Sequence, residues 1–149
     1  MKYAFLLLGL TCVHLSHAAE IKPEIQSYLN LAETKQLNHA RTWQRLMYAN
    51  AQGKSEVNYA GYFLAEHGSI DLKKEMQQNI QALFTAAEPN QSIRCKFPAR
   101  SHWLIQQLNI SEQQLPAVSC PEFEQWIGQV KPYKATLIYA TDFMLSLIH

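Results

Sequence analysis

The sequence has 149 residues, of which 48% are hydrophobic and 17% are charged, and it contains 5 Gly and 6 Pro. This length leaves room for one domain, and the composition excludes a disordered, collagen-like or coiled-coil protein. Lys and Arg total 13 against 12 Asp and Glu, so the chain lacks the positive field typical of proteins that bind nucleic acid or an anionic membrane.

The first twenty residues have the pattern of a secretory signal peptide. Lys2 precedes an apolar run over residues 3–15, and Ser16-His17-Ala18 forms a small-x-small cleavage site. The run is shorter than the ~20 apolar residues that a membrane-spanning helix needs. The residues before Cys12 do not form a lipid-attachment site. We therefore predict cleavage after Ala18 and a periplasmic mature chain, which has 12 basic and 12 acidic side chains once Lys2 is removed.

Cys95 and Cys120 are the two cysteines of this mature chain. Thiols are oxidised in an exported protein, and two cysteines allow one intramolecular bridge, so we predict a Cys95–Cys120 disulfide. A bridge across 25 positions is expected to stabilise the fold by about 3 kcal/mol. We predict no metal, because zinc sites usually have four Cys or His ligands with at least one close pair, and His102 lies seven positions from Cys95.

The spacing of apolar residues predicts about five helices in chain order. The expected ranges are 23–36, 40–47, 72–84, 98–108 and 121–130. The third is the clearest, with Leu72, Met76 and Ile80 on one face and Asp71 as its N-cap. Asn38 is a candidate N-cap for the second helix.

Two apolar segments without helical spacing predict short extended stretches. Tyr59–Leu64 is expected to be an extended segment or a single short strand, and Thr136–Tyr139 a strand. The predicted fold class is therefore mainly α, a small helical domain of about five helices with one or two short strands and one disulfide. The predicted organisation is a signal peptide at 1–18, a helical periplasmic domain at 19–134 and a strand-like tail at 135–149.

A search for catalytic motifs identifies no catalytic residue and no cofactor site. The sequence contains no Gly-x-Ser-x-Gly, no phosphate-binding glycine loop and no His-Glu-x-x-His. His39, His67 and His102 are far apart in the sequence and are expected at the surface or at helix ends. Glu122 and Glu124 diverge on a helix, so they are expected to favour its N-terminal dipole and not to share a proton.

The tryptophans and a group of basic residues give further expectations. Trp43, Trp103 and Trp126 each lie on the apolar face of an expected helix, which predicts three helices meeting in one core. Arg94, Lys96 and Arg100 form a basic cluster whose favoured interpretation is a solvated edge. A buried ion pair of Arg100, or its contact with an anionic group, is the alternative.

The motif Cys95-Lys96-Phe97-Pro98-Ala99-Arg100, with Trp103 and a later Cys120-Pro121, gives the sequence a family resemblance. It resembles the N-terminal helical region of bacterial envelope proteins that carry an Lnb-type periplasmic domain. The resemblance extends over about residues 38–142 and marks Phe97, Pro98, Arg100 and Trp103 as family-motif residues.

The resemblance implies a helical leader that precedes a larger periplasmic domain. In some relatives that domain is associated with N-acylation of lipoproteins, and in most it has no assigned activity. Family members continue after the last strand with a Gly-His motif, whereas this chain reads Asp142 to His149 without it, so no catalytic role passes to His149. We expect a truncated member whose tail is the start of a missing larger domain.

Two functions from different classes follow from these observations. The favoured one is an exported helical accessory or partner-docking module, with an envelope or inner-membrane protein as partner and no nucleic acid. The alternative is a fragment of a periplasmic enzyme, an acyltransferase or hydrolase, whose catalytic part lies elsewhere. The absence of a nucleophile and base in one place favours the docking module.

Overall fold

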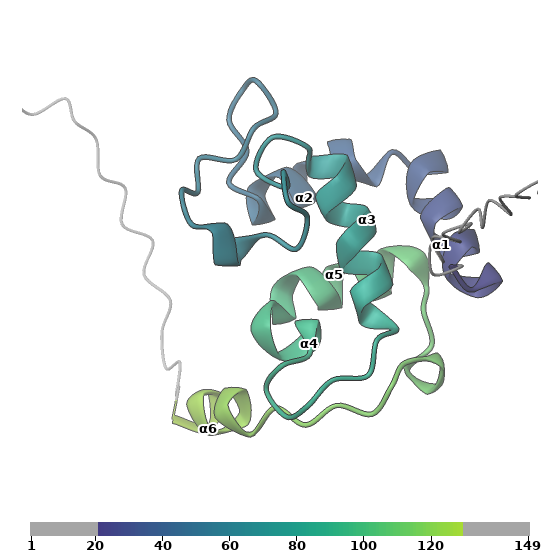
Figure 1. The fold of residues 1–149 in the computed structure, drawn as a ribbon, viewed down its shortest axis with the longest axis vertical. Coiled ribbons are helices and arrows are strands. Elements are labelled where there is room, and N and C mark those ends of the chain that lie inside the picture. The colour runs from purple at the N-terminus through teal and green to yellow at the C-terminus, as the bar shows by residue number, and fades with distance from the viewer. Residues whose placement is uncertain (1–20, 130–149) are drawn as a thin grey trace, which may run out of the picture.

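The computed structural model describes residues 21–129 (Figure 1). The predicted signal peptide and the predicted strand-like tail lie outside these residues. Among the described residues the fold is mainly α, as predicted. Its elements are α1 (Pro23–Thr34), η1 (Leu37–His39), α2 (Arg41–Leu46), η2 (Ala60–Tyr62), α3 (Leu72–Leu83), α4 (Ile93–Lys96), α5 (Pro98–Leu108), η3 (Glu112–Gln114) and α6 (Pro121–Gln129), where η marks a 3-10 turn.

Helix α3 forms the centre of the fold, and α1, α4 and α5 pack against it (Figure 1). Its apolar face is buried as the sequence pattern predicted, with the side chains of Leu72, Met76 and Ile80 no more than 7% exposed. The predicted cap of this helix is confirmed, because the Asp71 carboxylate accepts a hydrogen bond from the Lys74 N–H at 2.8 Å. No helix among residues 21–129 is both long enough and apolar enough to cross a membrane.

Two features of the helical pattern differ from the sequence prediction. Asn38 does not cap α2, because it lies inside the 3-10 turn η1. This turn follows Gln36, whose backbone is left-handed with φ of 50°. The N-cap of α2 is therefore Ala40, which offers no side-chain hydrogen bond. Helix α4 was not predicted, since its four residues are too few to show a helical period.

Of the two predictions for Tyr59–Leu64, an extended segment or a single short strand, the strand is wrong. The segment contains the 3-10 turn η2 between an extended Tyr59 and an extended Phe63. The backbone N–H of Leu64 and that of Ala65 both bond to the Glu75 carboxylate, so a strand could not use them for pairing. Within the described ranges β pairing is limited to an isolated bridge.

The tryptophan prediction is confirmed for two of its three members. Trp43 is fully buried, its ring centroid lies 5.9 Å from that of Trp103, and its Nε1–H donates to the Leu72 carbonyl at 3.1 Å. Trp126 is 57% exposed on α6, so the prediction that it joins the core is wrong. Helix α6 is short and follows Cys120, which the disulfide attaches to α4. Because α6 does not pack on α3, its apolar face is exposed to solvent.

Candidate functional site

The candidate site is a group of five residues that we call the Arg100 cluster, in which Glu75, Asn79 and Arg100 are buried and Tyr62 and Phe97 are partly buried. Glu75 and Asn79 lie on α3 and Arg100 lies on α5. Tyr62 belongs to the loop over residues 56–70, and Phe97 joins α4 to α5. The cluster therefore lies where the loop meets the two central helices.

Glu75 connects the loop to both helices. Its side chain is fully buried, and its carboxylate accepts hydrogen bonds from the Leu64 N–H at 2.9 Å and the Ala65 N–H at 2.8 Å. It also accepts from Asn79 Nδ2 at 2.7 Å and lies 3.4 Å from Arg100 Nη1. Through these contacts the carboxylate fastens the loop to α3 and α5.

Arg100 lies between two aromatic rings inside the same cluster. Its guanidinium carbon is 3.9 Å from the ring centroid of Tyr62 and 4.0 Å from that of Phe97. Its Nη1 donates to the Tyr62 carbonyl at 2.8 Å, and the side chain is 3% exposed. The favoured interpretation of this residue as part of a solvated basic edge is therefore wrong, and the alternative of a buried ion pair is confirmed.

The other two members of the predicted basic cluster lie elsewhere. Arg94 forms an ion pair with Glu112 at 2.7 Å, and Lys96 is exposed. The three side chains point to different surroundings because α4 ends at Lys96 and α5 begins at Pro98, so the chain changes direction between them.

Two buried polar atoms of the cluster have no hydrogen-bond partner among the described residues. They are Nη2 of Arg100, a donor, and Oδ1 of Asn79, an acceptor. An unpartnered buried polar atom costs about 1–3 kcal/mol. A buried ion pair often adds no more stability than apolar residues of similar volume.

The family-motif residues have structural positions in this arrangement. Phe97 and Arg100 belong to the Arg100 cluster, Pro98 begins α5, and Trp103 stacks on Trp43. The predicted disulfide between Cys95 and Cys120 is confirmed, with a Cα–Cα distance of 5.3 Å. The sequence motif thus brings together the cluster, the start of α5 and the disulfide.

Sequence reasoning missed Glu75 and Tyr62 as partners of Arg100. One signal for Glu75 was available, since it lies three positions after Leu72 and one before Met76, on the apolar face of α3. A charged residue on an apolar face needs a buried partner of opposite charge. Tyr62 gave no comparable signal, because its contact depends on the path of the loop.

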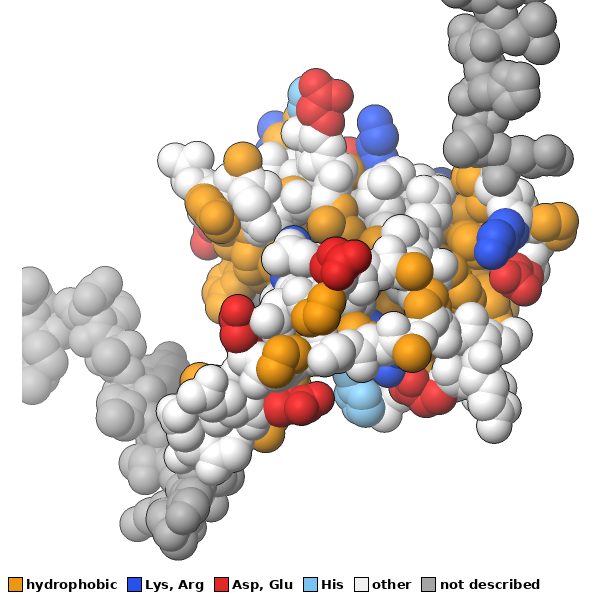
Figure 2. Space-filling model, turned by 60° about the horizontal axis from the view of Figure 1, so that its bottom comes forward, with side chains coloured by type: hydrophobic (Ala, Val, Ile, Leu, Met, Phe, Trp, Pro, Cys, Tyr) orange, Lys and Arg blue, Asp and Glu red, His pale blue; other side chains and the backbone are white. Residues whose placement is uncertain are grey.

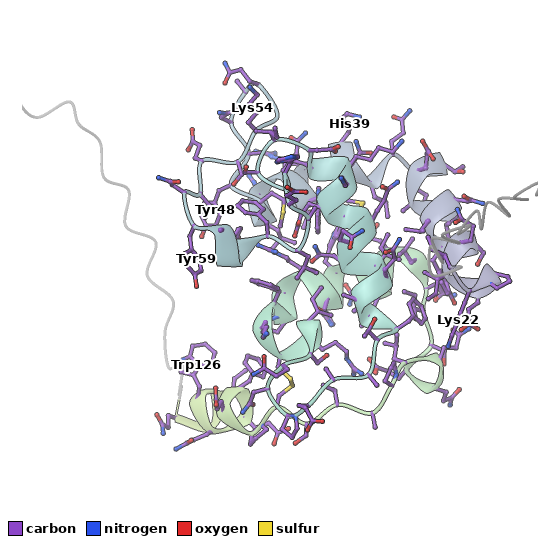
Figure 3. The ribbon with its side chains drawn as sticks, viewed as in Figure 1. Lys22, His39, Tyr48, Lys54, Tyr59 and Trp126 are labelled. Carbon is purple, nitrogen blue, oxygen red and sulfur yellow. A yellow bond between two sulfur atoms is a disulfide. The ribbon has the colours of Figure 1, made fainter. Side chains whose placement is uncertain are left out.

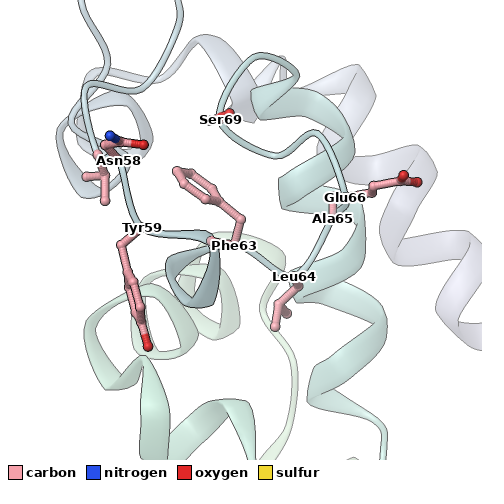
Figure 4. A pocket seen from close by; sticks show the side chains of 9 residues that line it. Asn58, Tyr59, Phe63, Leu64, Ala65, Glu66 and Ser69 are labelled. Carbon is pink, nitrogen blue, oxygen red and sulfur yellow. The ribbon is translucent and has the colours of Figure 1, made fainter.

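The outer side of the loop forms a pocket of about 350 Å³ (Figure 4). Phe63 points toward Asn58 and Ser69, whereas the ring of Tyr59 points away from them (Figure 4). Tyr59 is 70% exposed. The hydrogen bonds of Glu75 to Leu64 and Ala65 hold one wall of this pocket.

The histidines and the possible metal ligands of the described residues are dispersed. His39, His67 and His102 are all exposed, as expected. Within residues 21–129, no group of three or more His, Cys, Asp or Glu side chains is arranged to hold a metal ion. Figure 2 shows acidic and basic side chains scattered singly over one face of the molecule, with apolar side chains between them.

Comparison with known proteins gives one match. Residues 35–107 match a family model described as a domain of unknown function, DUF7843. The match includes all five residues of the Arg100 cluster and ends within α5, before Cys120. No curated protein and no solved structure matches the chain.

Proposed function

We propose that this protein is an exported, non-catalytic module that docks a partner protein of the bacterial envelope. The single observation that carries the proposal is the Arg100 cluster, which fixes a surface loop through a buried ion pair. The proposal also follows the resemblance to the helical region that accompanies Lnb-type periplasmic domains. A disulfide supports export, because such bridges persist in oxidising compartments.

The energetics of the cluster favour positioning over stability. Apolar residues of similar volume often replace a buried ion pair with no loss of stability. A core that served stability alone would therefore not need Glu75 and Arg100. What these residues provide is a defined path for the loop, since Glu75 binds two of its N–H groups and Arg100 binds one of its carbonyls.

The loop presents exposed apolar side chains. Tyr59 is 70% exposed, Ile70 59% and Leu64 40%. Tyrosine is enriched among the residues that dominate the free energy of protein–protein binding. A rigid loop with exposed apolar groups loses little conformational entropy on binding, which suits a docking surface.

The proposal is tested by photo-crosslinking in cells of the organism that makes the protein. A photo-reactive phenylalanine analogue replaces Tyr59 on the loop and, as a control, Gln26 on the exposed side of α1. We expect a crosslink to one envelope protein from position 59 and none from position 26. Periplasmic fractionation and an intact mass that begins at Ala19 test the export of the chain.

Three results would overturn the proposal. The first is the absence of any specific crosslink at position 59, and the second is equal crosslinking at position 26. The third is hydrolytic or acyl-transfer activity of the purified mature protein, which would support the enzyme alternative.

A further inference from the structure

A second hollow lies beside α2 and differs in character from the loop pocket. This groove, which we call the α2 groove, has a volume of about 450 Å³. Its lining residues are Arg41, Gln44, Arg45, Tyr48, Ala49 and Glu56. Tyr48, which lines the α2 groove, and Tyr59, which lines the loop pocket, lie on the same side of the molecule, away from α1 (Figure 3).

The two arginines of the α2 groove are unpaired. Arg94 and Arg100 both form ion pairs with carboxylates, whereas Arg41 and Arg45 are exposed and form no ion pair with any residue that the structure describes. They lie four positions apart on one helix, where like charges are neighbours and repel each other. An anion between them would remove this repulsion.

Tyr48 adds an independent observation at the same place. Its backbone is left-handed, with φ of 50°, and its ring is 63% exposed. This conformation after a helix is typical of Gly or Asn and is a genuine outlier for a bulky residue. The Tyr48 carbonyl accepts from the Glu56 N–H at 3.0 Å, which helps to hold the residue there. The ring makes one aromatic contact, edge-on to Tyr62 with 6.2 Å between the ring centroids, and most of it stays exposed. Backbone strain of this kind clusters at functional sites.

We propose that the α2 groove binds an acidic peptide segment of the docked partner, in extended conformation, with carboxylates on alternate residues. This inference rests on the docking function proposed above. Side chains four apart on a helix have Cβ atoms about 5–6 Å apart. Alternate residues of an extended peptide lie about 6.6 Å apart on one face. One carboxylate therefore faces Arg41 and the other Arg45, each in the planar geometry that arginine prefers.

The remaining groups of the α2 groove favour a peptide over a phosphate group. Glu56 and Gln44 line the groove with the arginines and can accept hydrogen bonds from peptide N–H groups. A phosphate has no N–H group to donate to Glu56 or Gln44, whereas a peptide backbone has one at nearly every residue. The ring of Tyr48 provides an apolar surface for the stems of the peptide side chains.

The test is a titration of the mature, disulfide-bonded protein followed by NMR at low salt. The probes are the peptide acetyl-Glu-Gly-Glu-amide, its matched neutral peptide acetyl-Gln-Gly-Gln-amide, and inorganic phosphate. We expect the glutamate peptide to shift resonances of α2, Tyr48 and Glu56. Two solvent-exposed ion pairs should make it bind about fivefold to tenfold more tightly than the neutral peptide.

Three variants distinguish peptide binding in the α2 groove from a non-specific attraction between the peptide and positive charge. The double variant Arg41→Gln/Arg45→Gln should remove the preference for glutamate. Lys74→Gln, which removes one positive charge on the exposed side of α3, should not change it. Tyr48→Asn should weaken peptide binding while leaving the thermal midpoint about unchanged, because Asn tolerates a left-handed backbone and this gain offsets the lost ring contact with Tyr62. A Tyr48 with a structural role alone would not lower peptide binding at constant stability.

Several results would overturn the inference. They are equal binding of the two peptides, binding of phosphate as tight as that of the glutamate peptide, shifts outside the α2 groove, and full peptide binding by the Tyr48→Asn variant. A specific crosslink at position 59 together with equal peptide binding would reject the inference and leave the docking function standing. Selective peptide binding without a crosslink would reject docking through the loop, and only the selectivity of the α2 groove for acidic peptides would remain.

Discussion

Glu75 on α3 and Arg100 on α5 face each other inside the protein, with 3.4 Å between Oε1 and Nη1 and no more than 3% of either side chain exposed. The two residues are 25 positions apart, and the loop that they fix precedes both of them. Removal of either residue therefore affects the ion pair and also the anchoring of the loop.

We expect Glu75→Ala and Arg100→Ala each to lower the free energy of unfolding by about 3–5 kcal/mol, because each leaves an uncompensated buried charge. The double variant should lose less than the sum of the two single variants, since it leaves no lone charge. Urea denaturation of the mature protein measures all three values. Additive losses would show that the pair does not act as a unit.

A surface ion pair provides the control for this prediction. Lys73 pairs with Glu33, and their side chains are 48% and 62% exposed. We expect Lys73→Ala to change the free energy of unfolding by less than about 1 kcal/mol, because solvent screens exposed charges. A loss as large as that of Arg100→Ala would mean that burial is not what distinguishes the Arg100 cluster.

Gly68 is expected to tolerate no side chain. A Cβ at this position would overlap the Glu75 carboxylate and lie 2.9 Å from the Cβ of Phe63. We expect Gly68→Ala to lower the free energy of unfolding by about 1–3 kcal/mol through this overpacking. The clash would displace the Glu75 carboxylate, which holds the loop through Leu64 and Ala65. The variant should therefore also lose the crosslink from position 59.

Gly128 is the matched control for the same substitution. A Cβ there meets no atom within 4 Å, and the residue lies inside α6. Gly128→Ala should raise the helicity of α6 without lowering the denaturation midpoint, because Ala is a better helix former by about 1 kcal/mol. Circular dichroism and thermal melts compare the two variants.

The helices could be predicted because local residues determine them. Pro23, Pro98 and Pro121 each mark the first residue of a helix, and Asp71 caps α3 as expected. The disulfide followed from the number of cysteines in a chain that is predicted to be exported. These features depend on residues close in sequence or on a pairing without alternatives.

The path of the loop could not be predicted, because its partners are distant in sequence. Leu64 is eleven positions from Glu75, and Tyr62 is thirty-eight from Arg100. The same reason explains the wrong prediction for Arg100, whose neighbours Arg94 and Lys96 suggested a solvated edge. Only the fold shows that a carboxylate on the apolar face of α3 meets this guanidinium.

The disulfide is expected to contribute substantially to stability. It closes a separation of 25 residues and attaches the end of α4 to the residue before α6. We expect Cys120→Ser, combined with Cys95→Ser to avoid a free thiol, to lower the free energy of unfolding by about 3 kcal/mol. Urea denaturation of the double variant measures this loss. Two free thiols in the unfolded, unreduced wild-type protein would contradict the bridge itself.

The last prediction concerns the different environments of Trp43 and Trp126. Trp43 is fully buried and stacks on Trp103, and its indole N–H bonds to the Leu72 carbonyl at 3.1 Å, whereas Trp126 is 57% exposed. Trp43→Phe removes this hydrogen bond and leaves a cavity, so we expect the free energy of unfolding to fall by about 1–3 kcal/mol.

Trp126→Phe should change the free energy of unfolding by less than about 0.5 kcal/mol, because little of that ring is buried. The same variant should remove the tryptophan fluorescence that acrylamide quenches most strongly. Trp43→Phe should leave that fraction in place. If Trp126→Phe instead destabilises the protein as much as Trp43→Phe, α6 packs into the core in solution, and the original prediction of three tryptophans in one core is correct.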